Sequence, residues 1–155
     1  MSVNTKQVTR RTGVHYESLD DVLTDAEQLA GDQSKQLGNW SPGQVYSHLA
    51  KTMNASIDGF GFTISVPVRL ILQLFMKRRF LRKSIPAGIN GGNFSSPQKV
   101  SDEQGLDDLR AAVMRQMEEP SRVEHPGLGK LSREEWTNFH LRHAELHMSF
   151  LDGAS

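Results

Sequence analysis

The last helical pattern of the chain is its most constraining feature, because it places two histidines where apolar residues are expected. Ser132 and Glu135 form a Ser-x-x-Glu capping box, which predicts that a helix begins directly after Ser132. At about 100° per residue, His143 and His147 fall on one face with large apolar side chains, namely Trp136, Phe139, Leu146 and Phe150. An imidazole on such a face must satisfy two ring nitrogens away from water, and a missing partner costs about 1–3 kcal/mol. Both histidines therefore require buried partners.

The spacing of His143 and His147 suits a metal ion. Residues four apart on a helix lie roughly 6 Å apart at Cβ, so their imidazoles can converge on one ion. A third ligand is needed, and His48 is the best candidate because it flanks the apolar face of another predicted helix. Its neighbours along that helix are small and leave room for a cavity: Thr52, Ala55 and Gly59. Three neutral imidazoles leave open positions for water, as in catalytic zinc sites.

A simpler interpretation of His143 and His147 is equally supported by their spacing alone. Core histidines can bond to carbonyls, carboxylates or buried water, and six histidines in one chain make chance pairs common. The periodicity therefore predicts that the pair points inward, and leaves open whether it holds an ion.

The remaining histidines and acid–base candidates are less informative. His140 lies at the edge of the same face, and we expect it to hydrogen-bond a ligand rather than the ion. His125 and His15 lie in non-helical segments and receive no role. No general base stands at a predictable position. The nearby candidates are Tyr16, Asp58 and Glu145, of which Glu145 should point away from the site.

Capping residues predict three further helices and an all-α fold. They are expected after Ser18, Ser41 and Ser101, the second with Pro42 at its first position. Gly31 ends the first of these helices, the second runs to about Phe60, and Pro120 lies just beyond the third. The apolar stripe of the third is Leu106, Leu109, Val113 and Met117. No β-alternation, repeat or linker appears, so residues 1–155 are interpreted as one domain.

A helical pattern from Pro67 to Arg82 is apolar at first and then strongly basic. Its apolar run is shorter than the roughly 18 residues of a membrane span and contains Arg69, so stable membrane insertion is not expected. It is either a core helix with a solvated basic end or an interfacial helix that rests on anionic lipid or another acidic surface. We expect the core helix. The segment from Pro86 to Pro97 is rich in helix breakers and is predicted to be a loop that can act as a lid.

Composition excludes several classes of function. Eighteen Lys and Arg balance eighteen Asp and Glu, so bulk electrostatics attract no nucleic acid, and no such partner is expected. Without cysteine, thiolate nucleophiles and zinc–sulfur sites are excluded. The first residues lack the apolar stretch of a signal peptide, which predicts a cytoplasmic protein. The apolar helix of residues 67–82 can supply a homodimer surface.

Two motifs in combination carry a resemblance to a known superfamily. Residues 38–50 contain Trp-Ser-Pro-Gly-Gln followed by His48, and residues 136–147 end in His-x-x-x-His. Together they resemble the DinB/YfiT-like superfamily of bacterial metal-dependent proteins. The whole chain is more similar to an uncharacterised family within it, which shares Arg10-Arg11, Ser-Ile-Asp-Gly at 56–59 and His-Pro-Gly at 125–127.

The resemblance implies a fold and a ligand set. The fold is a four-helix bundle with a long crossover between the second and third core helices, which here is residues 66–100 and contains an extra helix. The implied metal triad is His48, His143 and His147. The commoner superfamily ending has Gly-Gln after the last histidine, whereas Met148-Ser149-Phe150 follows here, so the substrate class is not carried over.

Two functions follow as expectations. The first is a metal-dependent enzyme, in which the three histidines bind Zn²⁺, Ni²⁺ or Fe²⁺ and activate water for hydrolysis or a low-molecular-weight thiol for transfer to a small-molecule substrate. The resemblance implies thiol transfer more strongly than hydrolysis. The second is a non-catalytic helical binding module, in which the histidines are structural and the basic helix of residues 66–83 docks a partner or a membrane.

Overall fold

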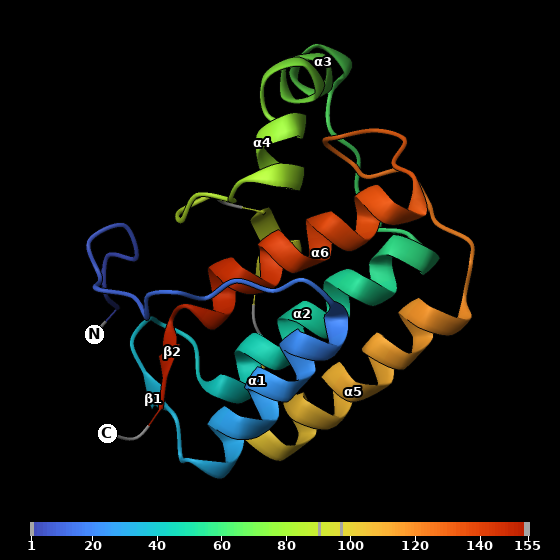
Figure 1. Cartoon of the computed structure of the whole chain (residues 1–155). Helices are drawn as coiled ribbons and strands as arrows, with labels where there is room; N and C mark the ends of the chain where they lie inside the picture. Colours follow the sequence, from blue (N-terminus) through green and yellow to red (C-terminus); the bar gives the residue numbers. More distant parts are fainter. Residues whose placement is uncertain (1, 90, 97, 154–155) are drawn as a thin grey trace.

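The computed structural model describes residues 2–89, 91–96 and 98–153, and this part of the chain is mostly helical (Figure 1). It contains six α-helices, one short 3-10 helix and a two-stranded antiparallel sheet. The α-helices are α1 (Leu19–Gly31), α2 (Pro42–Asp58), α3 (Val66–Phe75), α4 (Lys77–Arg82), α5 (Asp102–Glu118) and α6 (Arg133–Met148). The short elements are β1 (Lys35–Gln36), β2 (Leu151–Asp152) and the 3-10 helix η1 (Gly92–Ser95). The expected helical class is confirmed.

Side-chain caps explain why the four longest helices begin where the sequence predicts. Each capping serine accepts a hydrogen bond from a backbone N–H in the first turn of its helix, and the four are Ser18, Ser41, Ser101 and Ser132. In α1, α2 and α6 the third helical residue also bonds back to the backbone of the cap. A cap of this kind stabilises a helix by about 1 kcal/mol.

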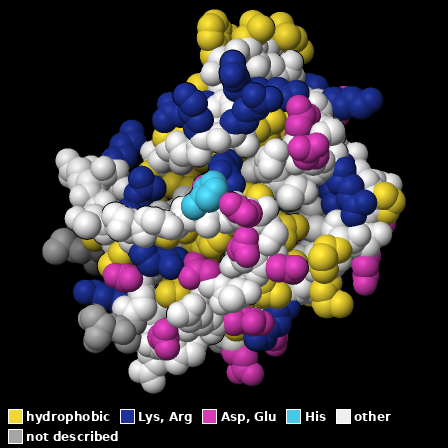
Figure 2. Space-filling view, viewed as in Figure 1, with side chains coloured by type: hydrophobic (Ala, Val, Ile, Leu, Met, Phe, Trp, Pro, Cys, Tyr) yellow, Lys and Arg dark blue, Asp and Glu magenta, His cyan; other side chains and the backbone are white. Residues whose placement is uncertain are grey.

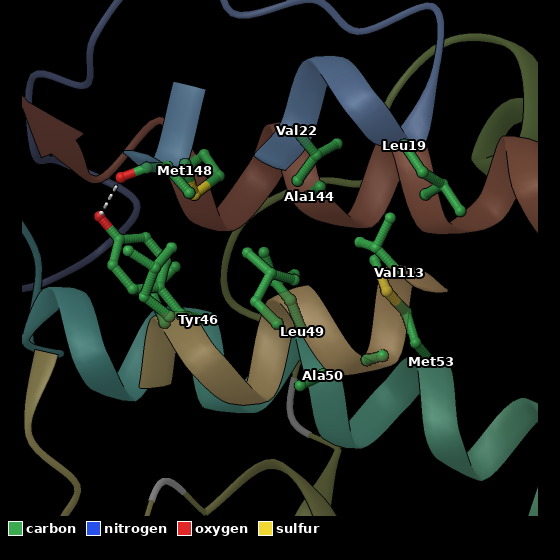
Figure 3. Close-up of a cluster of buried hydrophobic side chains, with 14 of the residues drawn as sticks. Leu19, Val22, Tyr46, Leu49, Ala50, Met53, Val113, Ala144 and Met148 are labelled. Carbon is green, nitrogen blue, oxygen red and sulfur yellow. Dashed lines mark hydrogen bonds between the residues drawn. The ribbon is translucent and has the colours of Figure 1, made fainter. Parts of the chain in front are cut away.

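The main core lies between α1, α2, α5 and α6. Apolar side chains from all four helices meet there, as Figure 3 shows for Val22 of α1, Leu49 of α2, Val113 of α5 and Ala144 of α6. These four side chains are almost completely buried. Because each helix presents an apolar stripe to the others, burial of that stripe is the main force that holds them together.

Helices α2 and α5 approach each other closely at their N-terminal ends, where two glycines meet. A Cβ atom on Gly43 would lie 2.5 Å from the carbonyl oxygen of Ser101, and one on Gly105 would overlap the backbone of Gly43. The Gly43 N–H donates to the side chain of Asp102 at 2.7 Å. This contact places α2, and with it His48, against the rest of the core.

The segment that follows α2 differs from the expectation of one core helix at residues 67–82. The chain bends at Met76 and forms two helices, α3 and α4. No residue of α3 is buried, so the core interpretation is wrong for that helix. Phe80 and Leu81 of α4 are buried and pack in a second apolar cluster with residues that include Trp136 and Phe139 of α6.

Three smaller expectations also need correction. The paired strands β1 and β2 were not expected, because two-residue strands carry no alternating pattern. Met117 is exposed, although it continues the apolar stripe of α5. The expected loop of residues 86–97 includes η1, and its positions Asn90 and Pro97 lie outside the described residues.

Figure 1 places α3 and α4 on one side of α6, and α1 and α5 on the other. In the part of the chain that the structure describes, no helix is long and apolar enough to cross a membrane.

Candidate metal centre

Three histidines from two helices converge at one point. His48 lies in α2, and His143 and His147 lie one turn apart in α6. The Nε2 atom of His143 is 3.2 Å from Nε2 of His48 and 3.1 Å from Nε2 of His147. One ring nitrogen from each of the three residues lies within 4.8 Å of the others. The structure therefore brings together the three histidines selected from the sequence.

Hydrogen bonding is an incomplete account of these short contacts. A neutral imidazole nitrogen carries either one hydrogen or one in-plane lone pair, so the two contacts at Nε2 of His143 would have to share that single group. An ion bound by three imidazoles accepts all the lone pairs at once. Zn–N bonds of about 2.0–2.1 Å in tetrahedral geometry separate the nitrogens by roughly 3.3 Å, which is close to the 3.1 and 3.2 Å contacts at Nε2 of His143. The donor set fits a divalent ion.

The electrostatic environment keeps the three imidazoles neutral. Burial, followed by the charge of Lys51, lowers the pKa of His48 to about 4. Burial also lowers the pKa of His143 and of His147 well below the ordinary value, and the neighbouring imidazoles lower it further. A cationic imidazole is therefore disfavoured, and the lone pairs that would bind an ion are available at neutral pH.

Aromatic rings hold the imidazoles in place. Trp40, in the segment just before α2, stacks on His147 with ring centroids 5.1 Å apart and lies 4.9 Å from His48. Phe139 stacks on His143 at 5.6 Å. Because these contacts restrict ring rotation, the convergent arrangement is preorganised.

A cavity of about 870 Å³ opens over the histidines. The chain between α2 and α5 supplies much of its wall, through apolar side chains that include Phe62, Leu72, Met76, Phe80, Ile85 and Phe94. Thr52 also lines it, whereas Ala55 and Gly59, the other small neighbours of His48, are not among the lining residues. A largely apolar cavity beside a polar cluster is the usual form of a small-molecule site.

The described residues that line the cavity include no Asp, Glu, Lys or Arg. The acid–base candidates from the sequence have partners elsewhere. The Tyr16 hydroxyl donates to Asp25, and the Asp58 carboxylate bonds to Arg115. Glu145 accepts from the backbone N–H of Tyr16 at 2.9 Å, away from the cavity as expected. Proton transfer in the cavity would therefore depend on histidines or on bound molecules.

His125 is a cavity residue to which the sequence assigned no role. It lies in the turn before α6, where its Nδ1 accepts hydrogen bonds from the backbone N–H groups of Gly127 and Leu128, each at 3.0 Å. Burial lowers the pKa of His125 to about 4, so the ring is neutral. Because Nδ1 is the acceptor, the proton is on Nε2, and this N–H is a fixed hydrogen-bond donor.

His140 lies one turn before His143 but bonds to a different partner. Its Nε2 is 3.2 Å from the Ser56 hydroxyl, and its ring stacks on Trp136. Its hydrogen bond therefore goes to α2 rather than to one of the three convergent histidines. His15 lies on the surface beside Glu145.

Sequence comparison provides one match. The model of a family described as "Protein of unknown function (DUF1569)" matches residues 8–153. No curated protein matches the chain. No solved structure matches it either.

Proposed function

The chain belongs to the DUF1569 family, and we propose that it binds one divalent metal ion through His48, His143 and His147 and acts on a small molecule in the cavity above it. The observation that carries the proposal is the convergence of three neutral ring nitrogens, with contacts of 3.1 and 3.2 Å at Nε2 of His143. Zn²⁺, Ni²⁺ and Fe²⁺ all suit imidazole ligands.

We further propose that the fold is a DinB-like four-helix bundle of one domain. In this view α1, α2, α5 and α6 are the core helices, and the crossover between α2 and α5 carries α3 and α4. The helix order and the main core support the assignment. The short motifs that carry the family resemblance also form structural contacts, which supports the assignment. Arg11 pairs with Asp25, Ser56 bonds to His140, and His125 forms the turn at 125–129.

The proposed reaction class is hydrolysis or transfer of a low-molecular-weight thiol. A divalent ion held by three imidazoles would supply Lewis acidity toward water, the thiol or a polar group of the substrate. The chain supplies the surroundings. Apolar side chains on the crossover exclude water and favour a substrate with an apolar portion, and the Nε2–H of His125 donates to a polar atom of that substrate. His125 is thus a positioning residue.

Elemental analysis of the tag-free protein tests metal binding. We expect about one divalent ion per chain after reconstitution and a rise in melting temperature with added metal. His143→Ala should abolish both effects, whereas His15→Ala, which changes an exposed histidine, should retain them. Wild-type protein that neither holds stoichiometric Zn²⁺, Ni²⁺ or Fe²⁺ nor shifts in melting temperature would overturn the proposal.

A non-catalytic role for the ion is the second candidate, since the same histidines can hold a structural ion. Reconstituted protein is assayed with p-nitrophenyl esters of increasing acyl length, and with a thiol and a chromogenic electrophile. Metal-dependent turnover that falls in His125→Asn without loss of metal supports the enzyme. Full metal loading with no turnover on either panel supports the structural role.

A further inference from the structure

Helix α3 presents its apolar side chains outward. Leu74 is 77% exposed and Phe75 is 74% exposed, and Val66, Leu70 and Ile71 are also exposed. In Figure 2 hydrophobic side chains form the upper edge of the molecule, over the position of α3 in Figure 1. The exposed apolar residues are consecutive on the helix surface, so they form one continuous patch rather than scattered positions.

The polar side chains of α3 face the body of the protein. Arg69 forms an ion pair with Glu124 at 2.6 Å, and Gln73 packs beside Gly129. Leu72 contributes to the cavity wall. A helix on a water-exposed surface normally has the opposite arrangement, with its polar side outward. The orientation of α3 is therefore that of a helix whose outer face is covered by an apolar phase.

The segment of the chain that carries this patch has charge of one sign. Between Gly59 and Ser101 the sequence has seven Lys or Arg and no Asp or Glu, whereas the rest of the chain has eleven Lys or Arg and eighteen Asp or Glu. The zero net charge of the whole chain does not reveal that this segment is basic and the rest is acidic. Arg78, Arg79, Arg82 and Lys83 are exposed on or just after α4. Figure 2 shows Lys and Arg side chains directly below the apolar edge.

We propose that α3 and α4 dock the protein on the surface of a membrane that contains anionic lipid. The outer face of α3 lies in the boundary between head groups and acyl chains, and the cations of α4 bind lipid phosphates. At 10 residues, α3 is about 15 Å long and lies on the bilayer rather than spanning it. The local charge of this segment offers an anionic surface an attraction that the zero net charge of the whole chain does not.

Charge also explains why lipid is a better occupant than a second copy of the chain. A symmetric pair that buried α3 against α3 would bring two sets of like charges from α4 toward one another. Lipid phosphates neutralise the same charges. The docking surface does not involve His48, His143 or His147, so the proposal stands independently of metal binding.

Flotation of the purified full chain with vesicles tests the proposal. Vesicles of phosphatidylcholine are compared with vesicles of phosphatidylcholine and phosphatidylglycerol, at low and high ionic strength. We expect flotation with the anionic vesicles that weakens with salt. Leu74→Ser with Phe75→Ser should reduce binding by at least about tenfold. Arg78→Ser with Arg82→Ser should reduce it by roughly 25-fold, at about fivefold per charge.

Matched controls change similar side chains elsewhere. Met114→Ser with Met117→Ser removes exposed apolar groups from α5, and Lys35→Ser with Arg110→Ser removes two cations away from the crossover. Both double variants should bind like the wild type. Equal effects of test and control variants, or no preference for anionic vesicles, would overturn the proposal. So would light scattering that detects a dimer dissociated by the Leu74 and Phe75 changes, since a second copy would then cover the face.

Discussion

The indole ring of Trp40 lies flat against the imidazole of His147, with the two planes 6° from parallel. A fluorophore is thus in contact with a proposed metal ligand. We predict that titration with Ni²⁺ or Co²⁺ quenches tryptophan fluorescence, and that Trp40→Phe removes most of the quenching because Trp136 alone remains. The measurement is emission intensity against metal concentration. Unchanged quenching in Trp40→Phe would show that the ion binds elsewhere.

The turn at residues 125–129 should become less stable when the hydrogen-bond acceptor Nδ1 of His125 is removed. His125→Ala leaves the N–H groups of Gly127 and Leu128 without that partner, so the free energy of unfolding should fall by about 1–3 kcal/mol. His125→Asn places an amide oxygen near the position of Nδ1 and should retain most of the stability. Urea denaturation measures both variants. Metal content should match the wild type in each, and loss of metal in either would place His125 in the metal centre.

Metal-free protein should lose stability as the pH falls below about 6.5. Burial lowers the pKa of His125 to about 4 and that of His140 to about 3, whereas an unfolded histidine titrates near 6.5. Above that pH both states are neutral. Below it the unfolded chain binds protons that the folded chain does not, so the free energy of unfolding falls by up to about 2 kcal/mol per histidine near pH 5.

Urea denaturation at neutral pH and near pH 5 tests this dependence, with His125→Asn as the comparison. That variant should lose less stability on acidification than the wild type, because one titrating group is gone. Equal stability of the wild type at the two pH values would mean that the buried histidines are protonated in the folded state.

The close contact of α2 and α5 predicts a strict size limit at Gly105. Gly105→Ala places a methyl group against the backbone of Gly43, and separating the helices should cost about 1–3 kcal/mol of stability. Gly31→Ala is the control, because a Cβ at that position, the last residue of α1, meets nothing within 4 Å. Thermal melting should show a lower midpoint for the first variant and little change for the second. A neutral Gly105→Ala would indicate that the helices move apart freely.

The parts of the molecule that sequence patterns predicted are those determined by neighbouring residues. Four helix starts depend on a capping serine, and three of them also on a side chain three positions later. The convergence of His143 and His147 depends on one helical turn. His48 could be selected because it flanks an apolar helical face. These features need no knowledge of distant parts of the chain.

The features that the sequence did not reveal depend on distant contacts. Trp40 meets His147 across the fold, and the cavity role of His125 depends on the crossover that closes over it. The apolar run in α3 predicted a helix correctly but could not say which way that helix faces, since core and interfacial helices share the same composition. The sequence has no Pro or Gly near Met76, so its pattern does not predict the break between α3 and α4.

The separation of charge between the crossover and the rest of the chain gives a formally neutral molecule a substantial electric dipole moment. A dipole experiences a torque in a field even when it experiences no net pull. Near a charged surface the protein would therefore be oriented rather than attracted as a whole. At moderate salt this effect reaches about 10 Å from the surface. Near neutral pH, the protein should therefore bind to both cation-exchange and anion-exchange resins, through different parts of its surface. The isoelectric point alone does not predict this behaviour.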